Sequence, residues 1–227
     1  MNVLVVAAHP DDEVLGCGAT IARHADRGDA VHVLILGEGI TSRHDQPSDA
    51  DPEELRALHR AAARASDVLG AKDCELSSLP DNRFDTVALL DVVKIVERAV
   101  AAWQPDVVYT HHGGDLNIDH AITFRAVLTA TRPTPGCGVR SLLAFEVPSS
   151  TEWAFGQLEP RFTPDTFIEV AATLDRKIAA LREYDGELRA FPHPRSAEGL
   201  EVVARRWGTA VGVDAAEAFV TIRSVVR

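Results

Sequence analysis

Cysteine and positive charge are both scarce in this chain of 227 residues. The three cysteines lie far apart and form no CxxC pair, so we expect no disulfide and a reducing, cytoplasmic location. Lysine and arginine number 23 against 34 aspartates and glutamates, which gives a net charge of −11. This charge argues against nucleic acid or an anionic membrane as a partner, although a metal ion and a few arginines can still receive a phosphorylated substrate.

Long apolar segments, linkers and internal repeats are absent as well. No segment approaches the ~20 apolar residues of a membrane span. The opening MNVLVVAAHPDDE lacks the basic region and the long apolar stretch of a signal peptide. Hydrophobic residues make up 46% of the chain, which is enough for a buried core. We therefore expect one soluble domain over residues 1–227.

Strands and helices alternate through the first 131 residues. Apolar runs predict strands at residues 2–7, 31–36, 72–76 and 106–110, and helices at 14–27, 52–69, 86–103 and 119–131. Later strands are predicted at 141–147, 167–170 and 219–222, with a helix at 173–189. The alternation is typical of an α/β fold, a single Rossmann-like domain whose mostly parallel sheet has helices on both faces.

The first motif, Ala8-His9-Pro10-Asp11-Asp12-Glu13, lies between the first strand and the first helix. Three consecutive carboxylates beside a buried strand repel one another and lose hydration, and a bound cation is the simplest relief. The dipole at a helix N-terminus also favours acidic residues. It explains one or two carboxylates but not the His-Pro before them. The motif therefore indicates a metal site.

The second motif, His111-His112-Gly113-Gly114-Asp115-Leu116-Asn117-Ile118-Asp119-His120, follows the fourth strand. Alone, it is equally well interpreted as a polar loop with helix-capping residues. In a doubly wound sheet, ligands bind between the carboxyl ends of the two strands at the reversal of strand order. If the fourth strand lies beside the first, the two motifs meet there. A histidine and a carboxylate from one loop and a histidine from the other then leave one coordination position open, as in catalytic zinc sites.

Together the motifs resemble those of the LmbE-like, or PIG-L, deacetylases, which have an AHPDDE-type loop and a later xxDH segment. The resemblance covers most of the chain and implies the same single Rossmann-like domain. It implies an enzyme that hydrolyses the acetamide of an N-acetylated sugar of the N-acetylglucosamine type. The implied cofactor is Zn2+, with another divalent metal left open. Several family members assemble, so a homo-oligomer also stays open.

The resemblance assigns metal binding to His9, Asp12 and His120. It makes Asp11 the general base, because a zinc ion lowers the pKa of bound water to roughly 7 and a nearby carboxylate can then take the proton. The two adjacent aspartates thus have different implied roles, one as a metal ligand and one as the base. Glu13 and Asp119 are expected to support these groups through hydrogen bonds.

The donor that stabilises the tetrahedral oxyanion is left open by two departures from the family pattern. Asn117 stands where many relatives have a histidine, and Asp115 stands where some have a tyrosine. The remaining candidates are His111, His112 and His193. Among them His193 is favoured, because its flanking prolines restrict the loop that carries it.

Polar residues of the strand-end loops are candidate sugar contacts. They are Arg43, Asp81, Asn82, Arg83, His111, His112, Asp115 and Asn117. Solvated loops have the same composition, so these assignments depend on the fold. Two further interpretations are structural: Cys17 is predicted to be a small packing residue, and Arg176, Lys177 and Arg182 are predicted to form a solvated helix face.

Three other functions fit the sequence less well. Gly16-Cys17-Gly18 imitates part of a GxGxxG dinucleotide motif, but position 21 is Ile and the acidic loop would face the pyrophosphate. A non-haem iron oxygenase with two histidines and Asp11 as ligands would leave Asp12 without a role, and such enzymes usually have a β-rich fold. A catalytically inactive binding module conflicts with the complete set of hydrolytic groups in the first motif.

Overall fold

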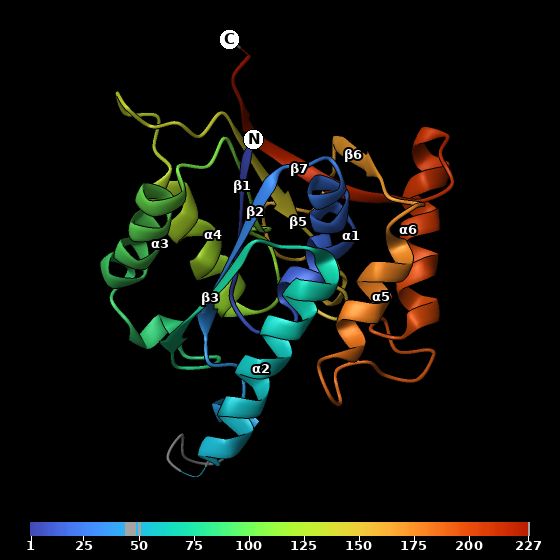
Figure 1. Ribbon diagram of the computed structural model, residues 1–227, viewed down its shortest axis with the longest axis horizontal. Helices are drawn as coiled ribbons and strands as arrows, with labels where there is room; N and C mark the ends of the chain where they lie inside the picture. Colours follow the sequence, from blue (N-terminus) through green and yellow to red (C-terminus); the bar gives the residue numbers. More distant parts are fainter. Residues whose placement is uncertain (44–48, 50, 227) are drawn as a thin grey trace.

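In a computed structural model, which describes residues 1–43, 49 and 51–226, seven strands form one sheet in the order β3-β2-β1-β4-β5-β7-β6 (Figure 1). The strands are β1 (Asn2–Ala7), β2 (Ala30–Gly37), β3 (Asp73–Leu79), β4 (Val107–His111), β5 (Ser141–Phe145), β6 (Thr166–Glu169) and β7 (Ala216–Ser224). The first five pair in parallel, while β7 pairs antiparallel with both β5 and β6. The predicted α/β fold with a mostly parallel sheet is confirmed.

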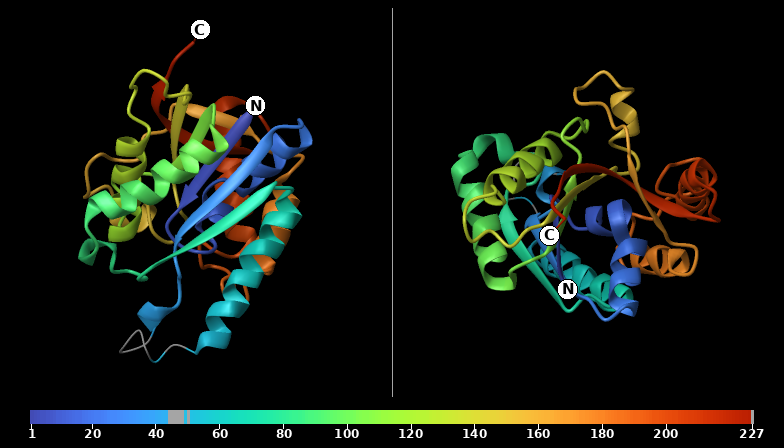
Figure 2. Two further views of the ribbon diagram at one scale, coloured as in Figure 1. Left: turned by 60° about the vertical axis from the view of Figure 1, so that its left-hand side comes forward. Right: turned by 90° about the horizontal axis from the view of Figure 1, so that it is seen from above.

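Helices cover both faces of the sheet (Figure 2). They are α1 (Asp12–Asp26), α2 (Pro52–Leu69), α3 (Leu89–Trp103), α4 (Ile118–Ala130), α5 (Leu174–Arg182) and α6 (Ala197–Val211). Alternate residues of β1 enter two cores: Val3 and Val5 pack with α1, α2, α5 and α6, and Leu4 and Val6 pack with α3 and α4. Because both faces of β1 are buried, its sequence is a continuous apolar run. No helix among the described residues is long and apolar enough to cross a membrane.

The structure differs from the sequence prediction mainly in the C-terminal third. The predicted helix at 173–189 ends already at Arg182. No element was predicted between residues 189 and 219, where α6 lies. This helix has ordinary signals at both ends, since Ser196 caps it by accepting a hydrogen bond from the Gly199 N–H (2.9 Å) and Gly212 ends it in the left-handed conformation.

Lys177 corrects the prediction of a solvated face on α5. Its side chain is buried, and Nζ donates to Glu217 Oε1 (2.6 Å) and to the Leu15 carbonyl (2.8 Å). Packing of α5 against α1 and α2 encloses this position, while Arg182 stays exposed. Cys17 is fully buried in the core, as predicted.

The position of β4 decides where the two motifs lie. It pairs in parallel with β1, with Thr110 opposite Val6, so both strands end at the same edge of the sheet. The loop that precedes α1 and the loop that precedes α4 therefore meet, which is the arrangement predicted for a fourth strand that lies beside the first.

Candidate metal and active site

The loop after β1 is held by its own carboxylates. The His9 N–H donates to Asp12 Oδ2 (2.9 Å), and the Asp11 N–H donates to Glu13 Oε2 (3.1 Å). Asp11 has a φ of 114°, in the region that favours glycine. Backbone strain of this kind persists where the surroundings hold it in place, and it is common at functional sites.

Three side chains from the two motifs form a buried group that can bind a metal ion. Ligand atoms of His9, Asp12 and His120 all lie within 4.8 Å of one another. Asp12 Oδ2 is 3.2 Å from His9 Nδ1 and 3.2 Å from His120 Nε2. The group combines two imidazoles with one carboxylate, a donor set that suits zinc and related divalent metals.

Charge within this group also fits a cation. Burial opposes protonation of His9, but hydrogen bonds with Asp119 and Asp12 raise its pKa to about 10. The pKa of His120 rises to about 9 in the same way, against burial and chiefly through the charge of Asp12. Burial would raise the pKa of Asp12, yet the charges of His120 and His111 hold it well below its usual value. The raised pKa values of the two histidines follow from the surrounding carboxylates, which favour a positive charge here that a divalent cation would supply.

Asp115 supports His120 from behind. Its Oδ1 lies 3.0 Å from His120 Nδ1, and its carboxylate accepts hydrogen bonds from the Ser150 and Thr151 hydroxyls and from the Asn117 N–H. Burial alone would raise the pKa of Asp115, but these interactions, first that with His120, lower it to about 2. A carboxylate on the far nitrogen of a ligating histidine fixes the ring and its tautomer. The structure therefore places Asp115 behind His120, a candidate ligand, and Asp115 does not line the cavity.

His9 has carboxylate partners of its own. Its Nε2 lies 3.0 Å from Asp119 Oδ2 and 3.4 Å from Asp81 Oδ1. Asp119 Oδ1 also accepts a hydrogen bond from the Phe84 N–H (2.9 Å). His9, Asp81 and Asp119 form a second group whose ligand atoms lie within 4.8 Å. Since Nδ1 of the same ring faces Asp12, these carboxylates hold the His9 ring from its other side.

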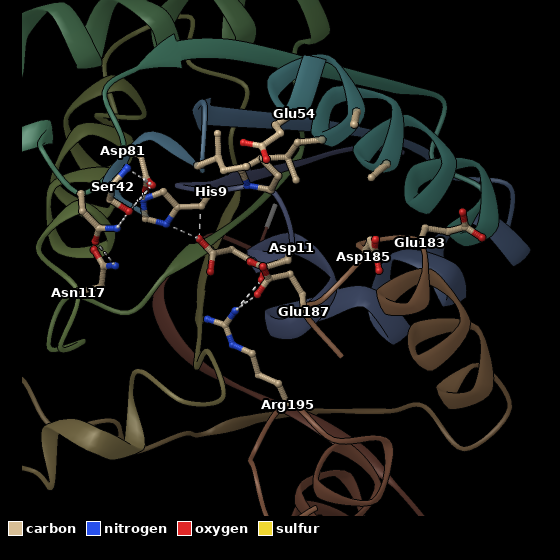
Figure 3. A pocket seen from close by; sticks show the side chains of 18 of the residues that line it. His9, Asp11, Ser42, Glu54, Asp81, Asn117, Glu183, Asp185, Glu187 and Arg195 are labelled. Atoms are coloured by element: carbon tan, nitrogen blue, oxygen red, sulfur yellow. Dashed lines mark hydrogen bonds and ion pairs between the residues drawn. The ribbon is translucent and has the colours of Figure 1, made fainter. Parts of the chain in front are cut away.

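Asp11 lies next to the metal group but has a different partner. Its Oδ2 accepts a hydrogen bond from Arg195 Nη1 (2.7 Å), as Figure 3 shows. Burial, together with the charges of Asp12, Glu187 and Glu13, raises the pKa of Asp11 well above its usual value, although Arg195 opposes this. No ion pair joins Asp11 to a histidine in the part of the chain that the structure describes.

Glu13 lies beneath Asp11 and is fully buried. Its Oε1 accepts a hydrogen bond from the Tyr184 hydroxyl (2.5 Å), while Oε2 accepts the Asp11 N–H. Burial raises the pKa of Glu13 to about 7. Glu13 thus links the strained turn at Asp11 to the segment after α5.

A cavity of about 650 Å³ opens beside the metal group (Figure 3). The predicted site residues on its wall are His9, Asp11, Asp12, Asp81, Asn82, Asn117 and His120. Asn117 caps α4 by accepting the Asp119 N–H (2.8 Å) and donates to Asn82 Oδ1 (2.9 Å), which explains how both amides are held at the wall. Arg83 is exposed and does not line the cavity, and the side chain of Arg43 lies outside the described residues.

The three histidines predicted as oxyanion donors lie off this wall. His111 is buried, and its Nε2 accepts the Ala8 N–H (2.8 Å). His112 is also buried. His193 is partly exposed and meets the Trp153 ring at 5.7 Å. The role of His193 in oxyanion stabilisation stays a prediction.

Sequence reasoning missed the C-terminal contribution to the cavity. Its wall also contains Ser149, Ser150, Glu183, Asp185, Glu187 and Arg195. These residues come from the loop after β5 and from the segment between α5 and α6. No motif or periodic pattern assigned them to the site. The one available signal was a charged residue, Arg195, in a proline-rich loop.

The site and fold agree with the comparison to known proteins. The model of the PIG-L family, described as GlcNAc-PI de-N-acetylase, matches residues 4–131. The chain belongs to this family of PIG-L, or LmbE-like, deacetylases.

Named relatives differ in the reaction that they catalyse. The chain is 28% identical over 189 residues to the uncharacterized deacetylase YaiS of Escherichia coli K12, covering 81% of this chain and 90% of that protein. It is 28% identical over 241 residues to 1D-myo-inositol 2-acetamido-2-deoxy-alpha-D-glucopyranoside deacetylase 1 of Saccharopolyspora erythraea, covering 84% and 78%. The structure of GalB, the 4-carboxy-2-hydroxymuconate hydratase of Pseudomonas putida KT2440, matches with a TM-score of 0.78 and 25% identity over 100% of this chain and 98% of that one. Proteins of this fold and sequence similarity thus include both deacetylases and a hydratase.

Proposed function

We propose that the protein is a zinc-dependent N-deacetylase that removes the acetyl group from an N-acetylglucosamine-type sugar or its conjugate. The observation that carries this proposal is the buried group of His9, Asp12 and His120 with the separate carboxylate of Asp11 beside it. Both lie on one cavity, whose volume of about 650 Å³ suits a small molecule. The relatives named as deacetylases support the reaction class.

The side chains divide the chemistry between them. His9, Asp12 and His120 would hold the metal, which when bound polarises water and an amide carbonyl. Asp11 takes the proton from the attacking water and delivers it to the amide nitrogen as the C–N bond breaks, so that acetate and an amine leave. Asn82 and Asn117 present amide groups to the cavity and are proposed to bind sugar hydroxyls.

The choice between the two aspartates separates this proposal from an iron oxygenase. Asp12 Oδ2 lies within 3.5 Å of three histidine nitrogens, whereas Asp11 pairs with Arg195. This arrangement supports Asp12 as the ligand and Asp11 as the base. Retention of both groups at a cavity also supports an active enzyme over a binding module.

A hydratase is the second candidate function, because the match to the Pseudomonas putida hydratase extends over the whole chain. Addition of water to a double bond uses the same activated water and base. The two reactions differ in substrate and product, so one assay series separates them.

The test is a panel of N-acetylglucosamine, its neutral and phosphorylated conjugates and 4-carboxy-2-hydroxymuconate, assayed with zinc-loaded protein. Acetate and free amine report deacetylation, and loss of the dienoate absorbance reports hydration. His120→Ala is the matched variant, and it should lose both the stoichiometric metal and the activity. Full metal content in His120→Ala removes this histidine from the site, and hydration without acetate release replaces the deacetylase with the hydratase.

A further inference from the structure

Arg195 connects the C-terminal segment to Asp11. Its Nη1 donates to Asp11 Oδ2 (2.7 Å) and to Glu187 Oε2 (3.1 Å), and its Nε donates to Ser149 Oγ (2.7 Å). Figure 3 shows the guanidinium reaching the metal side of the cavity from below Asp11 and Glu187. A guanidinium fixed at two nitrogens has little freedom, which makes it a rigid support.

Asp11 needs such a support. Its side chain is only 5% exposed, its backbone is in a conformation that favours glycine, and Asp12 and Glu13 follow directly. Within the described ranges, Arg195 is the only lysine or arginine with an ion pair to Asp11. Without this partner, a buried carboxylate among like charges would turn away from them.

The two carboxylate oxygens of Asp11 also differ in their hydrogen-bond partners. Arg195 occupies Oδ2, and no described residue donates a hydrogen bond to Oδ1. Asp11 lines the cavity, so Oδ1 is the oxygen left for a proton from water. Arg195 itself is shared by two carboxylates, which leaves it little net charge with which to bind an anionic substrate.

We propose that Arg195 is a positioning residue, which holds Asp11 so that Oδ1 accepts the proton during catalysis. This inference rests on the proposed function, in which Asp11 is the base. It assigns the orientation of the base to a segment outside residues 4–131, the range matched by the family model.

Arg195→Ala tests the proposal, with Arg189→Gln as control because Arg189 is an exposed arginine of the same loop. Loss of a group that orients an active-site residue typically costs about 10- to 100-fold. We expect a loss of kcat of that size, with KM within about threefold of wild type and unchanged metal content. Added guanidinium ion should restore part of kcat in Arg195→Ala, and Arg195→Lys should recover less than wild type because an ammonium cannot form the same fork. Arg189→Gln should behave as wild type.

A double-mutant cycle separates positioning from other roles. If Arg195 acts through Asp11, then Arg195→Ala in an Asp11→Asn background should cause no further loss of kcat. A further loss of about tenfold, a rise in KM with unchanged kcat, or loss of metal would overturn the proposal. If the wild type shows hydration and no deacetylation, the proposed function fails. The double-mutant cycle is then measured with the hydratase assay, so the role of Arg195 is still tested. If the wild type shows neither activity, the same four proteins are compared by their thermal midpoints. Additive shifts of the midpoint would then show that Arg195 and Asp11 are not coupled, and would reject the proposal.

Discussion

At the scale of single residues, two neighbouring aspartates have different partners and therefore different expected roles. Asp12 faces the histidines of both motifs, and Asp11 faces Arg195. Asp11→Asn keeps the shape of the side chain but removes its ability to take a proton. We expect the metal to stay bound and kcat to fall by about 100-fold or more, the usual scale for a general base. Metal analysis and steady-state kinetics on the same sample check this, and loss of metal from Asp11→Asn but not from Asp12→Asn would exchange the two roles.

Asp115 is expected to act on metal affinity and not on substrate. It fixes the His120 ring, and two hydroxyl groups and a backbone amide hold it in turn. Asp115→Asn should weaken metal binding by about 10- to 100-fold, as measured by competition with a chromophoric chelator. Asp91→Asn, on the exposed surface of α3, is the control. An Asp115→Asn protein with wild-type metal affinity and a raised KM would instead indicate that Asp115 contacts the sugar.

At the scale of secondary structure elements, the contact between α1 and β5 leaves no room for a side chain at Gly16. A Cβ atom there would lie 2.2 Å from the Phe145 ring. Gly16→Ala should therefore destabilise the protein by about 1–3 kcal/mol, the range for overpacking a core, despite the better helix propensity of alanine. Chemical denaturation measures the change. Gly138→Ala is a suitable control, because its Cβ would meet its nearest atom at 3.8 Å, and an equal loss there would reject the packing explanation.

The contact between the end of β5 and α6 is expected to depend on pH. Trp207 Nε1 donates to Glu146 Oε1 (2.5 Å), and burial raises the pKa of Glu146. A carboxyl group whose pKa is raised by folding stabilises the fold fully below its unfolded pKa. That contribution disappears as pH rises through the folded pKa. Glu146→Gln, which stays neutral and can still accept the hydrogen bond, should raise the thermal midpoint at pH 8 and change it less at pH 4. Equal shifts at both values would rule out titration of Glu146 as the cause.

At the scale of the whole molecule, sequence alone predicts the half of the site that parallel strands build. His9 and His120 follow buried strands with strong apolar patterns, so the topology of the sheet brings them together. Residues after β5 could not be placed in this way, because loops and antiparallel strands set no fixed meeting point. The prediction that Lys177 is solvated was wrong for a similar reason, since its partner Glu217 comes from β7, 40 residues later. The partner of Asp11 was missed because the local signal at Arg195, a charge in a proline-rich loop, does not indicate which residue it contacts.

The separation of the metal ligands from the partner of the base has an evolutionary consequence. All three candidate ligands lie between residues 9 and 120, whereas the proposed holder of the base lies at position 195. A lineage can therefore keep an inherited metal centre while mutation and selection reshape the C-terminal loops around it. New reactions on this scaffold would then arise by changing how the proton acceptor and the substrate are presented. That a hydratase and several deacetylases share this fold is the outcome such a division of the chain would produce.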